Sequence, residues 1–168
     1  MPVLNYLDET YTVRITVGEN SNEMWAVFDT AMSETVIETT SCTSCGTGTV
    51  DTGVSDNGLS VDSTAASGTL NNPDGATYTG FEGDVTLCIY ATGDYSTTPS
   101  TSNIGTMPCI QNMNVHFADD VTDPNANAVA YLGLAPGAGA DAAGNTPDST
   151  DLLMDQFETA GKFDSTSK

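Results

Sequence analysis

The sequence predicts a single domain of mainly β structure with one helix near its C-terminus. Apolar and polar residues alternate over several short runs, and that period is typical of half-buried strands. Glycine, serine, threonine and asparagine are concentrated between those runs, as expected for turns. Only residues 149–160 combine a helical spacing of apolar residues with signals for a helix start and end. At 168 residues, the chain is long enough to bury one hydrophobic core.

The clearest local feature is a β-hairpin over residues 10–29. Residues 10–17 alternate tyrosine, valine and isoleucine with threonine and arginine, so one face of this strand is expected to be buried. Residues 18–22 form a polar stretch that begins with glycine, and they predict the turn. Residues 23–29 are then the returning strand, which places the two strands side by side.

The middle of the chain predicts short strands separated by long turns. We expect a short strand at residues 35–37, just before two cysteines. Residues 46–77 contain few apolar side chains and predict short strands with long turns. Residues 78–83 are flanked by glycine and predict a turn, and residues 84–90 alternate as a strand does. Residues 93–102 are rich in serine, threonine and proline, and predict an exposed loop.

The last third predicts strands first and the helix last. Two separate strands are expected at residues 109–110 and 113–117, and residues 128–134 are an apolar run in which a glycine indicates a close approach of backbones. Residues 136–140 predict a flexible loop. The helix at residues 149–160 has these signals: Ser149 or Thr150 as its cap, Leu152, Leu153, Met154 and Phe157 as its apolar face, and Gly161 as its end.

The charge of the chain is strongly negative. It has 23 acidic and three basic residues, and its formal charge is −20. Such a surface repels nucleic acids and anionic membranes, so neither is an expected partner. No apolar run approaches the roughly 20 residues that a membrane-spanning helix needs, and residues 1–4 lack the features of a signal peptide. Because carboxylates lose their mutual repulsion on protonation, the charge fits an acidic compartment, and it fits equally well a charge that serves only to keep the chain in solution.

Four cysteines, Cys42, Cys45, Cys88 and Cys109, permit three disulfide pairings. The CxxC spacing of the first two also fits a zinc or redox motif. Zinc requires a second, similarly spaced ligand pair, and a redox motif is expected to open a helix, but glycine and threonine follow instead. We therefore predict disulfides Cys42–Cys45 and Cys88–Cys109, an oxidising compartment, and no metal or cofactor.

The candidate site lies where the predicted hairpin ends. Residues 26–28 are an apolar, β-prone run, and Asp29 follows them directly, with Thr30 and a small residue after it. A carboxylate at the end of a buried strand is costly unless it accepts hydrogen bonds, so Asp29 is either stabilised locally or retained for chemistry.

The run from Phe28 to Ser33 resembles the active-site loop of pepsin-like aspartic proteases, Phe-Asp-Thr-Gly-Ser-Ser. Four further segments are similar to that family: residues 5–11, 115–118, 129–134 and 152–161. Together they imply that residues 1–168 form one pepsin-like N-terminal lobe, whereas the enzymes have two lobes that each contribute one aspartate. In the family, the two carboxylates share a proton, and one activates water while the other acts as an acid.

Several positions depart from the family pattern. Ala31 replaces a glycine where the two active-site loops come close, and Met32 replaces a hydroxyl that supports the aspartate. Val36 occupies the position of a tryptophan that steadies the flap in many members. Ser33 is retained, and Tyr78 is the candidate for the flap tyrosine.

Two functions follow from the resemblance. In the first, the lobe is non-catalytic on its own and is an extracellular binding, structural or self-assembly module, with partners at the exposed inter-lobe face. The alternative is an acid endopeptidase that cleaves peptides with Asp29 after homodimerisation or with a separate second lobe. The weaker candidates are a second Asp-Thr-Gly run at 51–53, calcium binding by Asp119, Asp120 and Asp123, a catalytic His116 and a sugar platform at Trp25. For these residues we favour plainer interpretations: solvated carboxylates in turns, a strand residue at His116 and a packing residue at Trp25.

Overall fold

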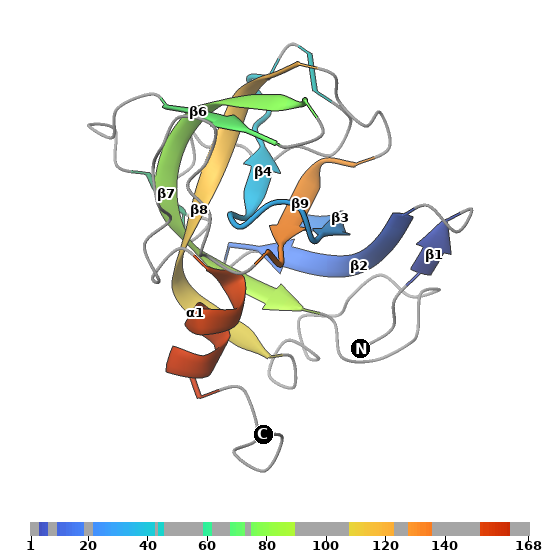
Figure 1. The fold of residues 1–168 in the computed structure, drawn as a ribbon. Helices are drawn as coiled ribbons and strands as arrows, with labels where there is room; N and C mark the ends of the chain where they lie inside the picture. Colours follow the sequence, from blue (N-terminus) through green and yellow to red (C-terminus); the bar gives the residue numbers. More distant parts are fainter. Residues whose placement is uncertain are drawn as a thin grey trace.

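The computed structural model describes residues 4–6, 10–18, 22–42, 44–45, 59–61, 68–72, 75–89, 108–122, 128–135 and 152–161. The described chain is mainly β, as predicted, and it contains nine strands and one helix (Figure 1). The strands are β1 (Leu4–Tyr6), β2 (Thr10–Val17), β3 (Asn22–Asp29), β4 (Val36–Glu38), β5 (Leu59–Val61), β6 (Gly68–Asn71), β7 (Thr77–Ile89), β8 (Cys109–Thr122) and β9 (Ala130–Gly133). The helix is α1 (Leu153–Thr159).

The strands form one mixed sheet that closes on itself. Its order is β1-β2-β3-β9-β4-β8-β7-β5, and β6 pairs with β7 outside this path. An additional antiparallel pairing joins β2 to β7, so the six strands β2, β3, β9, β4, β8 and β7 form a closed circuit. A closed circuit leaves these six strands with a shared interior, and that interior holds the main core.

Two parallel pairings determine where the candidate site lies. β3 runs parallel to β9, and β4 runs parallel to β8, whereas β9 and β4 are antiparallel. β9 is therefore inserted between the end of the first hairpin and the next strand of the chain. As a result Asp29, the last residue of β3, is paired with Gly133, the last residue of β9.

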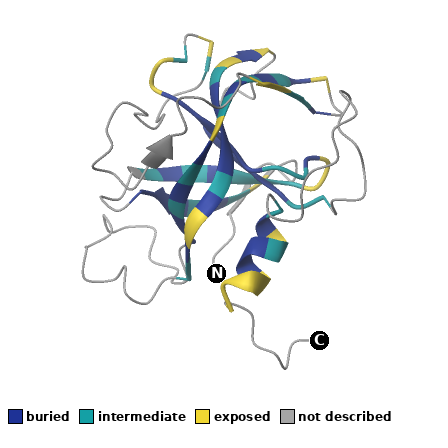
Figure 2. Ribbon diagram, turned by 90° about the vertical axis from the view of Figure 1, so that its left-hand side faces the viewer, coloured by how far each residue is buried: buried dark blue, intermediate teal, exposed yellow. Residues whose placement is uncertain are grey.

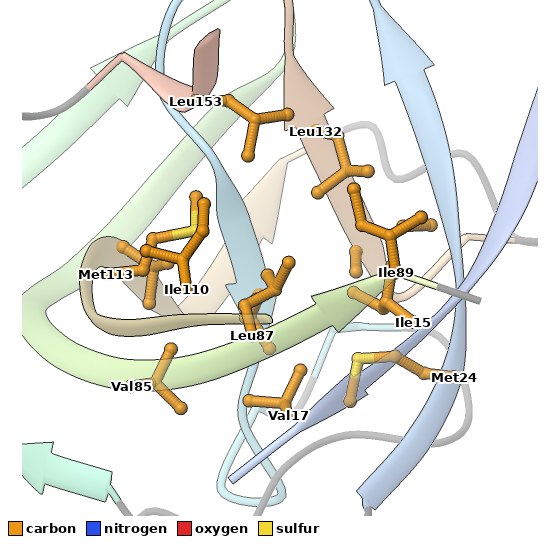
Figure 3. Packing of buried hydrophobic residues seen from close by; sticks show 14 of the residues in the cluster. Ile15, Val17, Met24, Val85, Leu87, Ile89, Ile110, Met113, Leu132 and Leu153 are labelled. Atoms are coloured by element: carbon orange, nitrogen blue, oxygen red, sulfur yellow. The ribbon is translucent and has the colours of Figure 1, made fainter. Parts of the chain in front are cut away.

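The main core is formed by alternate residues of the closed strands. Val13, Ile15 and Val17 of β2 are fully buried, as the alternation predicted. They pack with apolar side chains of β3, β7, β8 and β9 and with two residues of α1 (Figure 3). This cluster fixes the register of the sheet, because a slip of one residue would turn each apolar row toward water.

A second, smaller cluster lies on the other side of β4, β8 and β9. Its buried members are Met32, Val36, Ala76, Tyr78, Ala118, Val121, Ala128 and Tyr131, and the disulfide-bonded Cys42 and Cys45 pack against it. Residues of the β6–β7 hairpin cover this cluster, since Leu70 and Tyr78 belong to these two strands. The hairpin is thus attached to the barrel by an apolar contact as well as by its strand pairing.

Most predicted elements are confirmed where the structure describes them. β2 and β3 pair antiparallel as the predicted hairpin, and the short strand after Asp29 occupies Val36–Glu38, one residue later than predicted. Both predicted disulfides, Cys42–Cys45 and Cys88–Cys109, are present. The loops predicted at 93–102 and 136–140, the run at 51–53 and the helix caps Ser149 and Thr150 lie outside the described residues.

Two predictions about strands are wrong. Residues 78–83 are not a turn, because they lie inside the 13-residue strand β7. Gly80 is needed there for close packing: a Cβ at this position would overlap the backbone of Phe117 on β8. The strands expected at 109–110 and 113–117 are one continuous strand, β8, which passes through an irregularity at Asn112, where φ is 54°.

The helix is shorter than predicted. It begins at Leu153, and the side chain of the N-cap residue, Leu152, makes no capping hydrogen bond. Leu153 and Phe157 are buried, but Met154 is exposed, so its assignment to the apolar face is wrong. Figure 2 shows that the helix has both buried and exposed residues. Gly161 ends the helix as predicted, and its φ of 65° is the left-handed conformation that glycine adopts readily.

The described surface exposes few large apolar side chains. Among the described residues, the large apolar side chains that are exposed are Tyr11 on β2, at 51%, and Met154 on α1, at 50%. Within the same residues, no helix has the length and apolar character needed to cross a membrane.

Candidate functional site

The candidate site is built around Asp29 at the end of β3. The backbone is held on both sides of this residue: the Leu134 N–H donates to the Asp29 carbonyl at 2.7 Å, and the Ala135 N–H donates to the Met32 carbonyl at 2.9 Å. Gly133 allows this approach, because a Cβ there would overlap the backbone of Ser33 and Glu34. The predicted role of glycine in the apolar run at 128–134 is therefore confirmed.

The Asp29 carboxylate accepts three hydrogen bonds. Its Oδ1 accepts from the backbone N–H groups of Ala31, at 2.8 Å, and Met32, at 3.2 Å. Its Oδ2 accepts from the side-chain amide Nδ2 of Asn72, at 3.0 Å. Both oxygens of the carboxylate are thus bound by N–H donors, which is how a half-buried carboxylate avoids the free-energy cost of leaving water.

Asn72 was missed by the sequence reasoning. It is 5% exposed and directly follows β6, and its backbone N–H donates to the Ala76 carbonyl at 2.8 Å, which closes the β6–β7 turn. Gly75 donates back to the Asn72 carbonyl at 2.9 Å and has a φ of 101°. The Asn-Pro-Asp-Gly run at 72–75 is a strong turn signal, and it could have placed the hairpin turn there instead of at 78–83.

The other residues predicted for the site do not all meet at Asp29. Thr30 and Ala31 are exposed and Ser33 is half-buried, and all three lie in the loop that follows β3. Met32 is buried in the second cluster instead of replacing a hydroxyl donor. Tyr78 is 2% exposed, and its ring packs against Tyr131 with 5.3 Å between ring centroids. Tyr78 therefore lies inside the hairpin strand and contributes to packing.

His116 is a buried residue of β8, in agreement with its interpretation as a strand residue. It is 3% exposed, and its Nε2 has no hydrogen-bond partner. Burial lowers the pKa of its imidazole from 6.5 to about 4, while a hydrogen bond with the Tyr78 backbone and the nearby Asp119 carboxylate act in the opposite direction. The imidazole is therefore neutral near pH 7.

A pH dependence of global stability follows from this shift. The unfolded chain, in which His116 has its ordinary pKa, binds the proton at a higher pH than the folded chain does. Stability is therefore lost as pH falls from about 6.5 to about 4, by up to about 3 kcal/mol. Urea unfolding of the wild type and of His116→Gln at pH 7 and pH 4.5 measures this loss. The wild type should lose more stability than the variant, and equal losses would contradict the assignment.

The acidic residues considered for calcium bind hydroxyl groups. Asp119 accepts from Thr39 at 2.6 Å and from Ser41 at 2.9 Å. Asp120 accepts from Ser44 at 2.6 Å. These bonds hold the Cys42–Cys45 loop against β8, and no group of three or more potential metal ligands occurs in the described part of the chain. Asp123 lies outside that part.

Trp25 is half-buried on the surface of the first hairpin. Its ring pairs with Arg14 across β2 and β3, and the guanidinium carbon lies 5.9 Å from the ring centroid. Arg14 also forms an ion pair with Glu23. The tryptophan thus has a packing role, in agreement with its interpretation from the sequence.

No family model matches the chain, and no curated protein matches it. Within the described residues, the partners of the Asp29 carboxylate are two backbone amides and one side-chain amide, and none of them is a carboxyl group. Such an arrangement anchors one carboxylate but supplies no second carboxyl group to share a proton.

Proposed function

We propose that this chain is a pepsin-like aspartic-protease lobe that is non-catalytic on its own and acts as an extracellular binding, structural or self-assembly module. The proposal combines the resemblance of five segments of the sequence with the way in which Asp29 is bonded. It assigns Asp29 a structural role, which is to join the end of β3 to the β6–β7 hairpin.

The contact between Asn72 and Asp29 carries the proposal. In the shared-proton mechanism of aspartic proteases, the carboxylates must be free to bind a water molecule and each other. Here Oδ1 accepts two backbone amides, and Oδ2 accepts the Asn72 amide. An amide N–H donates a hydrogen bond to the carboxylate but cannot exchange a proton with it at ordinary pH. Asp29 is therefore suited to hold the hairpin in place.

The residues after Asp29 also support a non-catalytic role. Met32 has its side chain in the second apolar cluster, where it contributes packing and no hydrogen bond. Ser33, which retains the hydroxyl of the family motif, is half-buried and lies next to the close approach at Gly133.

The extracellular setting is inferred from the disulfides. Cys42 pairs with Cys45 and Cys88 with Cys109, and no cysteine is left free among the described residues. Disulfides of this kind persist in oxidising compartments and are uncommon in the cytosol. Partners that bind through the inter-lobe face, including a second copy of the chain, remain part of the proposal.

A proteolysis assay tests the proposal. The purified chain is incubated with unfolded casein between about pH 3 and pH 7, with and without a pepstatin-type inhibitor, and Asp29→Asn is the matched variant. We expect no cleavage that either the inhibitor or the substitution removes, because the site holds a single carboxylate whose oxygens are already bound. Inhibitor-sensitive cleavage that disappears in Asp29→Asn would overturn the proposal in favour of the acid endopeptidase.

Sedimentation under the same conditions distinguishes the two forms that an active protease could take, a homodimer and a lobe that needs a separate second lobe. Cleavage by a dimer would identify a homodimeric protease with two Asp29 residues at its two-fold axis. A self-assembly role predicts instead association that Asp29→Asn leaves unchanged and that is accompanied by no cleavage.

A further inference from the structure

Asn72 is bonded through both its side chain and its backbone at the turn between β6 and β7. It directly follows β6 and is 5% exposed, and Pro73 comes next in the sequence. Pro73 itself lies outside the described residues, so it enters the chemistry only through its ring nitrogen. A proline nitrogen carries no hydrogen, and this limits the reactions that are open to the asparagine before it.

An asparagine side chain can react with the neighbouring backbone by two routes. In the ordinary route, the backbone nitrogen of the following residue loses its hydrogen and attacks the side-chain carbonyl, and ammonia leaves. That route is closed at Asn72, because the next nitrogen belongs to proline. In the remaining route, the side-chain Nδ2 attacks the backbone carbonyl carbon of the same asparagine. This closes an imide ring and breaks the chain before the proline.

The amide nitrogen of Asn72 is in contact with a base. Its Nδ2 donates to Asp29 Oδ2 at 3.0 Å, and the nitrogen must face this way because a carboxylate only accepts hydrogen bonds. That distance is within the reach that proton transfer to a general base requires. The Asn72 Oδ1 has no hydrogen-bond partner among the described residues, so no donor there draws electron density away from the nitrogen.

The carbonyl group that the nitrogen would attack is also bonded. The Gly75 N–H donates to the Asn72 carbonyl oxygen at 2.9 Å. A donor in this position stabilises the negative charge that the oxygen gains when the carbon is attacked. The turn holds this donor in place, because the Asn72 N–H also donates to the Ala76 carbonyl at 2.8 Å. A nucleophile, a base and an oxyanion donor thus meet at one residue, and these are the groups that acyl transfer requires.

We propose that the chain cleaves itself between Asn72 and Pro73. Asn72 Nδ2 forms a bond to the Asn72 carbonyl carbon, and Asp29 Oδ2 takes one of its protons. The resting amide keeps both protons, and the nitrogen becomes acidic only as it bonds to carbon. The bond from this carbon to the Pro73 nitrogen then breaks, and Asp29 gives the proton to that nitrogen. The products are a C-terminal imide at residue 72 and a free amine at Pro73, and water later hydrolyses the imide.

Cleavage would convert the barrel into two associated chains. Residues 1–72 contain β2, β3 and β4, and residues 73–168 contain β7, β8 and β9. The pairings β2–β7, β3–β9 and β4–β8 join one fragment to the other, so the folded fragments should stay together. Each disulfide lies within a single fragment, so denaturation alone should separate them. The reaction occurs once, on the chain's own backbone, and therefore goes beyond the proposed function.

Mass spectrometry and denaturing gel electrophoresis without reductant test the reaction. The purified chain is kept at pH 7 for several days, and a sample unfolded in guanidinium chloride is the reference. The folded chain should yield fragments 1–72 and 73–168 at least about 100-fold faster than the unfolded chain does. Early in the reaction their masses should sum to the mass of the intact chain, because imide formation adds no water. The sum rises by one water when the imide is hydrolysed.

Two variants identify the groups that act. Asn72→Ala removes the nucleophile and should abolish both fragments. Asp29→Asn keeps a hydrogen-bond acceptor beside Asn72 but removes the base, so the rate should fall at least about 100-fold. Circular dichroism verifies that each variant is folded.

The imide keeps the proposal falsifiable even where a variant does not fold, since a contaminating protease would add water from the start. Absence of the two fragments, equal rates in folded and unfolded chain, or fragments that carry the extra water from the start would overturn the proposal. Cleavage at the same bond in Asn72→Ala, or an unchanged rate in folded Asp29→Asn, would overturn it as well.

Discussion

Gly133→Ala is expected to lower the free energy of unfolding by about 3 kcal/mol. Gly133 ends β9 beside Asp29, and a Cβ at this position would overlap the backbone of Ser33 and Glu34. Backbone atoms cannot turn aside as a flexible side chain can, so the loop after Asp29 must move as a unit. That movement would strain the bonds from Leu134 to Asp29 and from Ala135 to Met32, which hold β9 against the loop.

Urea unfolding followed by circular dichroism measures this loss, and Gly161→Ala is the matched control. Gly161 has a φ of 65° and no atom within 4 Å of its ideal Cβ, so alanine there meets only the conformational cost of about 1 kcal/mol. The two variants therefore separate steric overlap from backbone preference. If Gly133→Ala were no more destabilising than Gly161→Ala, the close approach at the site would be wrong.

Removal of the Cys88–Cys109 disulfide, by replacing both residues with alanine, is expected to lower the free energy of unfolding by about 3 kcal/mol. The two cysteines are separated by 21 residues in sequence, and they are register partners on β7 and β8. The bond therefore closes a loop of moderate length in the unfolded chain, and its loss restores the entropy of that loop.

The Cys42–Cys45 pair gives the comparison. Its sequence separation is three, so replacing both residues with alanine should cost about 1 to 2 kcal/mol less than removal of the long-range disulfide. Unfolding is measured without reductant, and mass spectrometry of the alkylated protein verifies which disulfide remains. Equal losses for the two double variants would show that loop length does not control the loss in the free energy of unfolding. The disulfide between β7 and β8 would then stabilise the fold by something other than loop closure.

Asp29 depends on distant parts of the fold for its position. Asp29 is bonded to the turn that follows it and to a hairpin from another part of the chain, and Gly133 brings β9 against that turn. A carboxylate with such partners contributes to the structure as a hydrogen-bond acceptor in a half-buried position. This is the physical basis for proposing a structural role in place of catalysis.

The sequence by itself determined the features that depend on neighbours along the chain. Alternation of apolar residues identified the hairpin of β2 and β3, because every second side chain of a strand faces the same side. The apolar run before Asp29 placed the carboxylate at the end of β3, and the positive φ of Gly161 agrees with its expected role at the helix end. Cysteine spacing and context indicated both disulfides.

The tertiary structure decided the features that depend on residues far apart in sequence. Asn72 binds Asp29 from 43 residues away, and no local pattern reports such a contact. Gly80 looked like a turn residue because glycine permits turns, yet its role is to let β7 approach the Phe117 backbone of β8. Glycine and asparagine serve turns, close contacts and side-chain hydrogen bonds alike, and only the packing of distant strands selects among these uses.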